Sequence, residues 1–315
     1  MVNHDGVVKK LHLVRCYIFS IITTYLMYAE IIEKLHASNM KIFTYPSNIK
    51  VLTSLSIMEF IAITPEIIFI LFCVGFAAGM VDSIAGGGGL IALPTLLFLG
   101  LPPQVALGTN KLQGSFGTFS AVVNYTRKGQ VTLRHGLTGI AFTLLGATFG
   151  AWLVQSLDPT IIKPLIPFML LFVFIYTVFA GNLGNKDTSP KLRMNVFYAL
   201  FGIGLGFYDG FFGPGTGSFW TVAFMFFAGF NMTKATGYTK LMNFTSNIGA
   251  LFWFIIGGNV VYSIGLIMGA GQIAGARIGS SLAIKNGTRF IRPIFLTVVL
   301  LTVIRLAYVN YISIT

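Results

Sequence analysis

Long, uninterrupted apolar runs constrain this chain more than any other feature of its sequence. Two examples are IIFILFCVGFAAGMV at residues 67–81 and LIPFMLLFVFIYTVFAG at residues 165–181. A helix of about 20 apolar residues crosses the core of a bilayer, whereas a strand of a membrane barrel would show about ten residues of alternating character. Only 10% of the residues are charged, and the mean hydropathy is +0.81. We therefore predict an all-α polytopic membrane protein.

The basic residues lie mostly in short stretches between these runs, although the net charge is +12. In a membrane protein such stretches set the orientation of the chain. No basic cluster with interleaved aromatic residues favours a nucleic acid as partner, so the partners that we expect are the lipid bilayer and a small substrate. Cys16 and Cys73 both lie inside apolar runs. Their positions predict neither a disulfide framework nor a metal site, and we expect no cofactor.

Residues 1–57 form an N-terminal extension that does not fit the rest of the chain. They hold one marginal apolar stretch, YIFSIITTYLMYA at 17–29, with basic residues before it and charges of both signs after it. The extension can be an extra helix, an uncleaved anchor or translated upstream sequence. We favour the last interpretation, because Met58 begins MEFIAITPEIIFILF, which is itself a plausible start.

An internal duplication organises the remainder of the chain. GMVDSIAGGGGLI at 79–91 aligns with GFYDGFFGPGTGSF at 206–219, and ALGTNKLQ at 106–113 aligns with ATGYTKLM at 235–242. Two further matches follow in the same order, GATFGAW with GQIAGAR and IIKPLI with FIRPIF. The predicted domains are a first transmembrane repeat at 58–181, a cytoplasmic linker at 182–194 and a second transmembrane repeat at 195–315.

Equivalent loops of the two repeats carry opposite charge patterns. The stretch 127–134 has three basic residues, whereas its equivalent, GGNVVYS at 257–263, has none. The next pair reverses this, because 285–292 has three basic residues against Asp158 and Lys163 in the first repeat. Loops rich in Lys and Arg stay in the cytoplasm. We therefore predict two inverted repeats with about eight spanning helices, the architecture of many secondary transporters.

The second apolar piece of each repeat is too short to cross a membrane. One piece lies at 90–100 and contains Pro94, and the other lies at 218–229. Short, interrupted segments at corresponding positions mark the binding site of a transporter, so we predict non-helical breaks at 84–89 and 211–217. Successive backbone N–H groups form concave anion sites, and a half-helix directs its positive end at such a ligand. The candidate site residues from these breaks are Gly86, Gly87, Gly88, Gly89, Gly213, Gly215 and Gly217.

Other glycines recur at four-residue spacing, and we interpret them as close helix contacts. They are Gly75, Gly79, Gly146, Gly150, Gly271 and Gly275.

Two aspartates, Asp82 and Asp209, are embedded in apolar sequence at equivalent positions, and ionisable groups there are candidates for function. The next segments add Lys111 and Lys240, which align with each other. In one interpretation each aspartate pairs with the lysine of its own repeat or caps the broken helix. In another, one aspartate takes up a proton and the lysines bind the substrate. In a third, the lysines extend to the membrane surface. The polar candidates beside the lysines are Asn110, Gln113, Asn243 and Asn247.

The paired motifs DSIAGGGGLIALPTLLFLG and GFYDGFFGPGTGSF, with ALGTNKLQ, KATGYTKLMNFTSNIGAL and GQIAGARIGS, resemble the TauE/SafE family of sulfite exporters. The similarity is greatest to its YfcA-like branch of bacterial inner-membrane proteins and covers residues 58–308. It implies an integral membrane permease for small sulfur-containing anions such as sulfite or sulfonates. It also supports Met58 as a start, because residues 1–57 have no counterpart in the family.

We therefore expect a multi-pass transporter of the bacterial inner membrane that exports a small sulfur-containing anion, driven by the membrane potential or a proton gradient. The chain has no Walker motif, which argues against ATP as the energy source. One alternative is a carrier of cations or metal ions centred on the two aspartates, and another is a membrane-embedded assembly factor. We expect no enzyme and no catalytic residue, because no His-based site is apparent. The histidines are His4, His12, His36 and His135.

Overall fold

The computed structural model describes residues 64–158, 160–162 and 187–286, and within them it has eight α-helices and no β-strand. The all-α prediction is confirmed for this part of the chain. The extension at 1–57 and the ends of both predicted repeats lie outside the described residues. The first four helices are α3 (Pro65–Ala85), α4 (Gly89–Phe98), α5 (Pro103–Arg127) and α6 (Leu133–Ser156). The next four are α8 (Met194–Phe211), α9 (Thr216–Phe226), α10 (Met232–Ile256) and α11 (Tyr262–Asn286).

The order of helix lengths repeats once along the chain. The first set has 21, 10, 25 and 24 residues, and the second has 18, 11, 25 and 25. The short helices α4 and α9 rise only about 15 Å each, at 1.5 Å per residue. They occupy equivalent places in the two sets, as the alignment of the two sequence motifs predicts.

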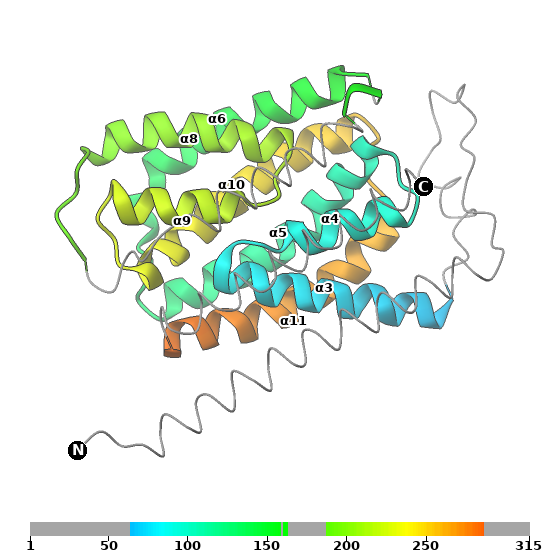
Figure 1. Ribbon diagram of the computed structural model, residues 1–315, viewed down its shortest axis with the longest axis horizontal. Coiled ribbons are helices and arrows are strands. Elements are labelled where there is room, and N and C mark those ends of the chain that lie inside the picture. Colours follow the sequence, from blue (N-terminus) through cyan, green and yellow to red (C-terminus); the bar gives the residue numbers. More distant parts are fainter. Residues whose placement is uncertain (1–63, 159, 163–186, 287–315) are drawn as a thin grey trace, which may run out of the picture. The chain divides into compact units, whose positions relative to one another are not determined.

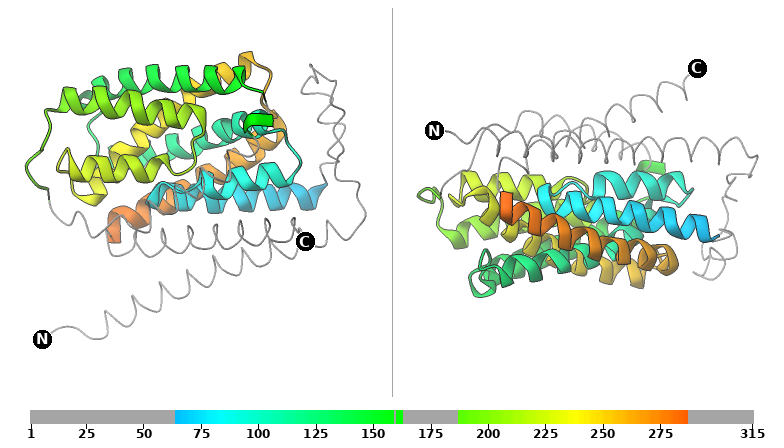
Figure 2. Two further views of the ribbon diagram at one scale, coloured as in Figure 1. Left: turned by 45° about the horizontal axis from the view of Figure 1, so that its top comes forward. Right: turned by 90° about the horizontal axis from the view of Figure 1, so that it is seen from below.

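Helices of the two sets pack crosswise. α3 lies against α11, and α8 lies against α6. Figure 1 shows these pairs at the bottom and top of the view, with α4, α5, α9 and α10 between them, and Figure 2 shows α3 and α11 side by side. A Cβ added to Gly79 would lie only 2.8 Å from Cα of Gln272. The packing interpretation is confirmed for Gly75, Gly79, Gly146, Gly150, Gly271 and Gly275, which all meet backbone atoms of the facing helix.

Many polar residues are buried and many large apolar residues are exposed in this part of the chain, beside an apolar core that includes Trp220 and Phe224. Lys111, Lys240 and Asp209 lie inside, whereas Leu200 and Phe252 are mostly exposed. Exposed apolar side chains around buried charges suit a bilayer as solvent. By length and mean hydropathy, two described helices qualify as membrane spans, namely α3 at 2.3 and α6 at 1.7. The other long helices carry more polar residues, as α5 and α10 do, or more glycine, as α8 and α11 do, which lowers their mean hydropathy.

Both helix breaks are narrower than the sequence predicts. α3 continues through Ala85 and ends at Gly86, whose φ of 83° is left-handed and whose N–H donates to the carbonyl of Asp82. α8 continues through Phe211, and left-handed backbone follows at Gly213 and Gly215, with φ of 98° and 82°. The predicted boundaries at 84–89 and 211–217 are therefore wrong at their edges, because each helix persists until the first residue that only glycine accommodates easily.

Candidate functional site

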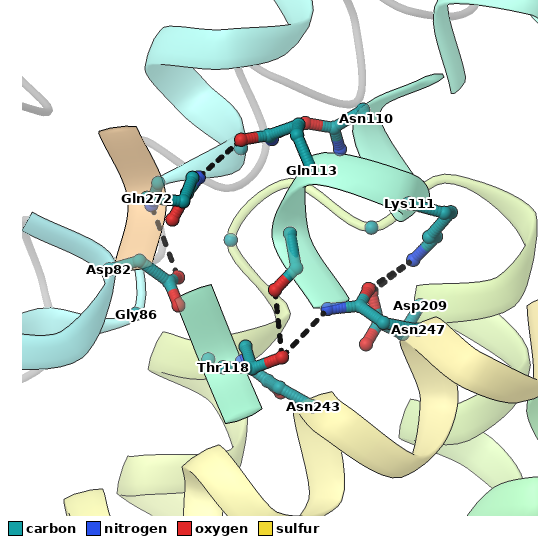
Figure 3. Close-up of a pocket in the computed structure, with 16 residues that line it drawn as sticks. Asp82, Gly86, Asn110, Lys111, Gln113, Thr118, Asp209, Asn243, Asn247 and Gln272 are labelled. Atoms are coloured by element: carbon teal, nitrogen blue, oxygen red, sulfur yellow. Dashed lines mark hydrogen bonds and ion pairs between the residues drawn. The ribbon is translucent and has the colours of Figure 1, made fainter. Parts of the chain in front are cut away.

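A cavity of about 430 Å³, including its opening, lies where α4 and α9 begin. All the predicted site residues line it except Gly87 and Lys240, and Figure 3 shows their side chains converging from both halves of the chain. The lining residues are Asp82, Gly86, Gly88, Gly89, Asn110, Lys111, Gln113, Gly114, Thr118, Asp209, Gly213, Gly215, Gly217, Asn243, Asn247 and Gln272.

Three lining residues, Gly114, Thr118 and Gln272, are missing from the sequence prediction. Gly114 and Thr118 follow Lys111 on α5 at spacings of three and seven, so they share its helix face. Gln272 is a lone amide within the small-residue run GAGQIAGA of α11. A polar side chain in such a run is itself a signal for a functional position.

The two breaks lie directly against each other. A Cβ added to Gly86 would come within 2.6 Å of Cα of Gly217, and one added to Gly89 would lie 3.1 Å from Cα of Pro214. Position 86 requires glycine for two reasons, namely its positive φ and the close contact with Gly217. The contact brings the first turns of α4 and α9 to one place.

Two buried ion pairs cross between the halves of the chain. Nζ of Lys111 lies 2.7 Å from Oδ1 of Asp209, and Nζ of Lys240 lies 2.9 Å from Oδ2 of Asp82. The expectation that each aspartate pairs with the lysine of its own repeat is therefore wrong. The reason is the contact of α5 with α10 at the centre of the bundle, from which each lysine reaches an aspartate of the other half.

The lysines do not extend to a surface. Their side chains are 1% and 0% exposed, for Lys111 and Lys240 respectively. The interpretation in which they reach the membrane surface is also wrong. A buried ammonium group is stable only beside a counter-charge, and the aspartates supply it.

The two carboxylates have different second partners. Oδ1 of Asp82 accepts a hydrogen bond from the N–H of Gly88 at 3.2 Å, so this aspartate also holds the first break in shape. Oδ2 of Asp209 accepts a hydrogen bond from the hydroxyl of Ser246, which also lies 3.0 Å from the carbonyl oxygen of Asn243.

Amide side chains complete the wall of the cavity. Nε2 of Gln272 donates to Oε1 of Gln113, and Nε2 of Gln113 donates to Oδ1 of Asn110 at 2.7 Å. Nζ of Lys111 also donates to Oδ1 of Asn247 at 3.4 Å. Oδ1 of Asn243 is buried and has no hydrogen-bond partner among the described residues. An amide can present either end to a ligand, because the two ends differ only by a rotation of the group.

Helix ends and backbone N–H groups meet at the cavity. The four charged side chains around it form two neutral pairs, so their net charge is zero. The first turns of α4 and α9 bring the positive ends of two helices to the breaks, and the last turns of α3 and α8 bring two negative ends. The N–H groups of Gly89 and Gly217 donate no hydrogen bond to another described residue, so both can donate to a ligand.

Known proteins similar to this chain are membrane transporters by name. The family described as "Sulfite exporter TauE/SafE" matches residues 71–306. A "Probable membrane transporter protein" of Haemophilus influenzae is 42% identical over 77% of this chain and 95% of its own length. The "Probable membrane transporter protein YfcA" of Escherichia coli K12 is 41% identical over 75% of this chain and 88% of its own length.

A more distant relative is a plant protein. The "Sulfite exporter TauE/SafE family protein 3" of Arabidopsis thaliana is 31% identical over 132 residues, which are 41% of this chain and 28% of the plant protein. The comparison with solved structures found no match. The family match spans most of the chain, and the bacterial relatives are similar over nearly their whole length. This chain therefore belongs to the TauE/SafE family of membrane transporters.

Proposed function

We propose that this chain is a secondary transporter that exports small sulfur-containing anions, such as sulfite or sulfonates, across the bacterial inner membrane. The observation that carries the proposal is the cavity between the two breaks. Its side-chain charges cancel, and the N–H groups of two helix ends remain to bind a negative group. The names of the relatives agree with transport, and that of the family with sulfite.

The ion pairs argue for an anion over a cation. A cation or metal ion at Asp82 or Asp209 would have to displace an ammonium group that already lies within 2.9 Å of the carboxylate. An anion instead meets the ammonium of Lys111, the amide of Asn243 and two free N–H groups. A membrane assembly factor would have no use for such a lined cavity.

The proposed membrane arrangement is two inverted repeats with about eight spanning helices and a cytoplasmic linker between them. The crosswise packing and the reciprocal ion pairs support two halves related by a two-fold axis. Opposite charge in equivalent loops supports inversion. With the cell interior negative, each negative charge that leaves gains about 2.3 kcal/mol per 100 mV, which favours export of an anion.

Flux measurements with the purified chain in liposomes test the proposal. We expect efflux of sulfite or methanesulfonate from loaded vesicles, and Lys111→Ala should reduce it at least about tenfold, because a charged group that contacts the ligand contributes 1.4 kcal/mol or more. Lys234→Ala, at a partly exposed lysine of α10, is the matched control and should retain the flux. Absence of flux for both anions, or flux of a divalent cation that Asp82→Asn abolishes, would overturn the proposal.

A further inference from the structure

We infer that Asp209 is the proton site of this transporter and that an anion binds at Lys111 together with one proton on Asp209. The inference rests on the proposed function and adds a residue-level coupling to it. It assigns unequal roles to two aspartates that occupy equivalent positions in the sequence.

The first argument is competition for a single ammonium group. Among the described residues, Lys111 is the one lysine that lines the cavity, because Lys240 is fully buried against Asp82 outside the lining. An anion in the cavity therefore meets Lys111, whose Nζ is held 2.7 Å from Oδ1 of Asp209. Two negative groups that share one ammonium repel each other, and a proton on the carboxylate removes that repulsion.

The second argument is that Ser246 can serve both protonation states of Asp209. Its hydroxyl has one proton but two neighbouring acceptors, Oδ2 of Asp209 and the carbonyl oxygen of Asn243. While Asp209 is ionised, the hydroxyl donates to the carboxylate. When Asp209 is protonated, its O–H donates to Oγ of Ser246, and Ser246 donates to the carbonyl oxygen of Asn243 at 3.0 Å. Both states satisfy the hydroxyl of Ser246 and the carboxyl group of Asp209.

Asp82 has no comparable partner in the part of the chain that the structure describes. Its two oxygens accept from the N–H of Gly88 and the ammonium of Lys240, which are donors only. If Asp82 were protonated, its O–H group would point at a donor from either oxygen and would have no acceptor. The alignment of Lys111 with Lys240 places Gly117 at the position equivalent to Ser246, so the first half has no hydroxyl there. Asp82 is therefore the structural aspartate of the two.

Few other charged groups reach Asp209. Its neighbour Tyr208 donates its hydroxyl to the carbonyl oxygen of Pro214 at 2.9 Å. Of the other helices against α8, α9 has no ionisable residue, and α6 has Arg134 and His135 only in its first turn. The third, α10, has Lys234 and Lys240, which pair with Asp187 and Asp82, and Tyr238. Thr143 and Ala147 are the α6 residues that face α8 near Asp209. Lys111 is thus the one charge that faces this carboxylate directly among the described residues.

The proton comes from water on the side to which the cavity opens and leaves on the other side with the anion. No covalent bond in the substrate changes. One proton per anion makes transport of a singly charged sulfonate electrically neutral. A doubly charged anion would still carry one net negative charge, so the membrane potential would drive its export.

Binding and proton uptake, measured on the same purified full chain, test the inference. Methanesulfonate is the probe, because a sulfonate stays ionised across the range in which proteins are stable. We expect its affinity to fall by up to about tenfold per pH unit as the pH rises, since one proton is linked to binding. A pH indicator in weakly buffered solution should report about one proton taken up per anion bound.

Two matched variants separate the aspartates. Asp209→Asn should bind methanesulfonate with an affinity that no longer depends on pH and with no proton uptake. Asp82→Asn changes the wall of the cavity and should weaken binding, but the binding that remains should keep both its pH dependence and its proton uptake. Ser246→Ala should reduce the proton uptake that accompanies binding, because protonated Asp209 loses Oγ of Ser246 as its acceptor. Ser246→Thr keeps the hydroxyl and should restore the uptake.

The outcomes distinguish the inference from the proposed function. If the unmodified chain binds methanesulfonate equally well at every pH and takes up no proton, the inference is wrong while the anion site stands. If Asp82→Asn rather than Asp209→Asn abolishes the uptake, the assignment to Asp209 is wrong. If neither methanesulfonate nor sulfite binds at any pH, the proposed function fails and the inference fails with it. The uptake measured on the unmodified chain requires no variant to fold.

Discussion

At the scale of single residues, the two crossed ion pairs stabilise the charges that lie inside this protein. Lys111 and Asp209 are almost fully buried, so neither charge can turn to water when its partner is removed. Removing one member of such a pair costs about 3–5 kcal/mol, because it leaves an uncompensated buried charge, whereas removing both costs much less.

The first prediction is a pattern of coupling energies. We expect alanine substitutions at Lys111 and Asp209, and likewise at Lys240 and Asp82, to couple by about 3 kcal/mol or more in thermal unfolding, because the double substitution leaves no unpaired charge. The pairs within one half, Lys111 with Asp82 and Lys240 with Asp209, are the controls and should show weaker coupling. Stronger coupling within each half than between halves would contradict the crossed arrangement.

The composition of the site, but not its pairing, could be predicted from the sequence. The rarity of charge in apolar segments marks Asp82, Asp209 and both lysines, and the duplication links them. Which lysine pairs with which aspartate depends on contacts between residues that are more than 90 positions apart in the sequence. No local sequence pattern predicts such contacts. Gln272 is missing for the same reason, because only packing brings α11 to the cavity.

At the scale of the helical elements, the approach of the two breaks depends on glycine. The second prediction compares Gly86→Ala with Gly129→Ala in thermal unfolding. Both glycines have positive φ, 83° and 71°, but a Cβ at Gly129 would meet nothing within 4 Å. The alanine at 129 should therefore cost only backbone strain, about 1 kcal/mol.

At Gly86 the added Cβ would also press on Gly217, with a further cost of roughly 1–3 kcal/mol. Anion binding should fall with Gly86→Ala and stay unchanged with Gly129→Ala. Equal losses of stability for the two variants would show that the breaks do not constrain each other.

The segment before α8 is fastened to the start of α10 by Asp187. Its carboxylate accepts hydrogen bonds from the backbone N–H and the side-chain amide of Asn231, the N-cap residue of α10, and lies 3.5 Å from Nζ of Lys234. The backbone hydrogen bond from Asn231 lowers the pKa of Asp187, with Lys234 adding to this effect against a partial loss of hydration.

The third prediction follows from that lowered pKa. Because the pKa of Asp187 is lower in the folded chain than in the unfolded chain, its stabilisation is present above the unfolded pKa and is lost as the pH falls through the folded value. Asp187→Ala should therefore lower thermal stability at neutral pH, by about 1 kcal/mol as for a lost helix cap, and by less in acid. Lys234→Ala should have a smaller effect, since an exposed ion pair contributes little. A deficit of Asp187→Ala that does not change with pH would contradict this account.

At the scale of the whole molecule, the repeated order of helices could be predicted from sequence because the motifs themselves repeat. The crosswise packing of α3 on α11 and of α8 on α6 could not. Each set of helices has glycine stripes that would fit more than one neighbour, and the choice among them is made by the assembled bundle.

The fourth prediction concerns orientation in the membrane. In a chain with Cys16 and Cys73 replaced by serine, cysteines at Lys128 and Tyr262 lie at equivalent ends of the two repeats. If the repeats are inverted, a membrane-impermeant maleimide added to intact cells should label the cysteine at 262 and not that at 128, because basic loops stay inside. A cysteine at Lys285 should also be protected. Labelling of both 128 and 262, or of neither, would indicate parallel repeats.

The reciprocal ion pairs also bear on the ancestry of the chain. In a symmetric dimer of half-length chains, the lysine of each copy would meet the aspartate of the other, and the same contact would occur twice. Lys111 with Asp209 and Lys240 with Asp82 reproduce that pattern within one polypeptide. If a gene for such a dimer were duplicated and fused, each of these charges would keep its partner in the fused chain. A half-length gene product has no such partner alone, so it would depend on a second copy for a stable fold.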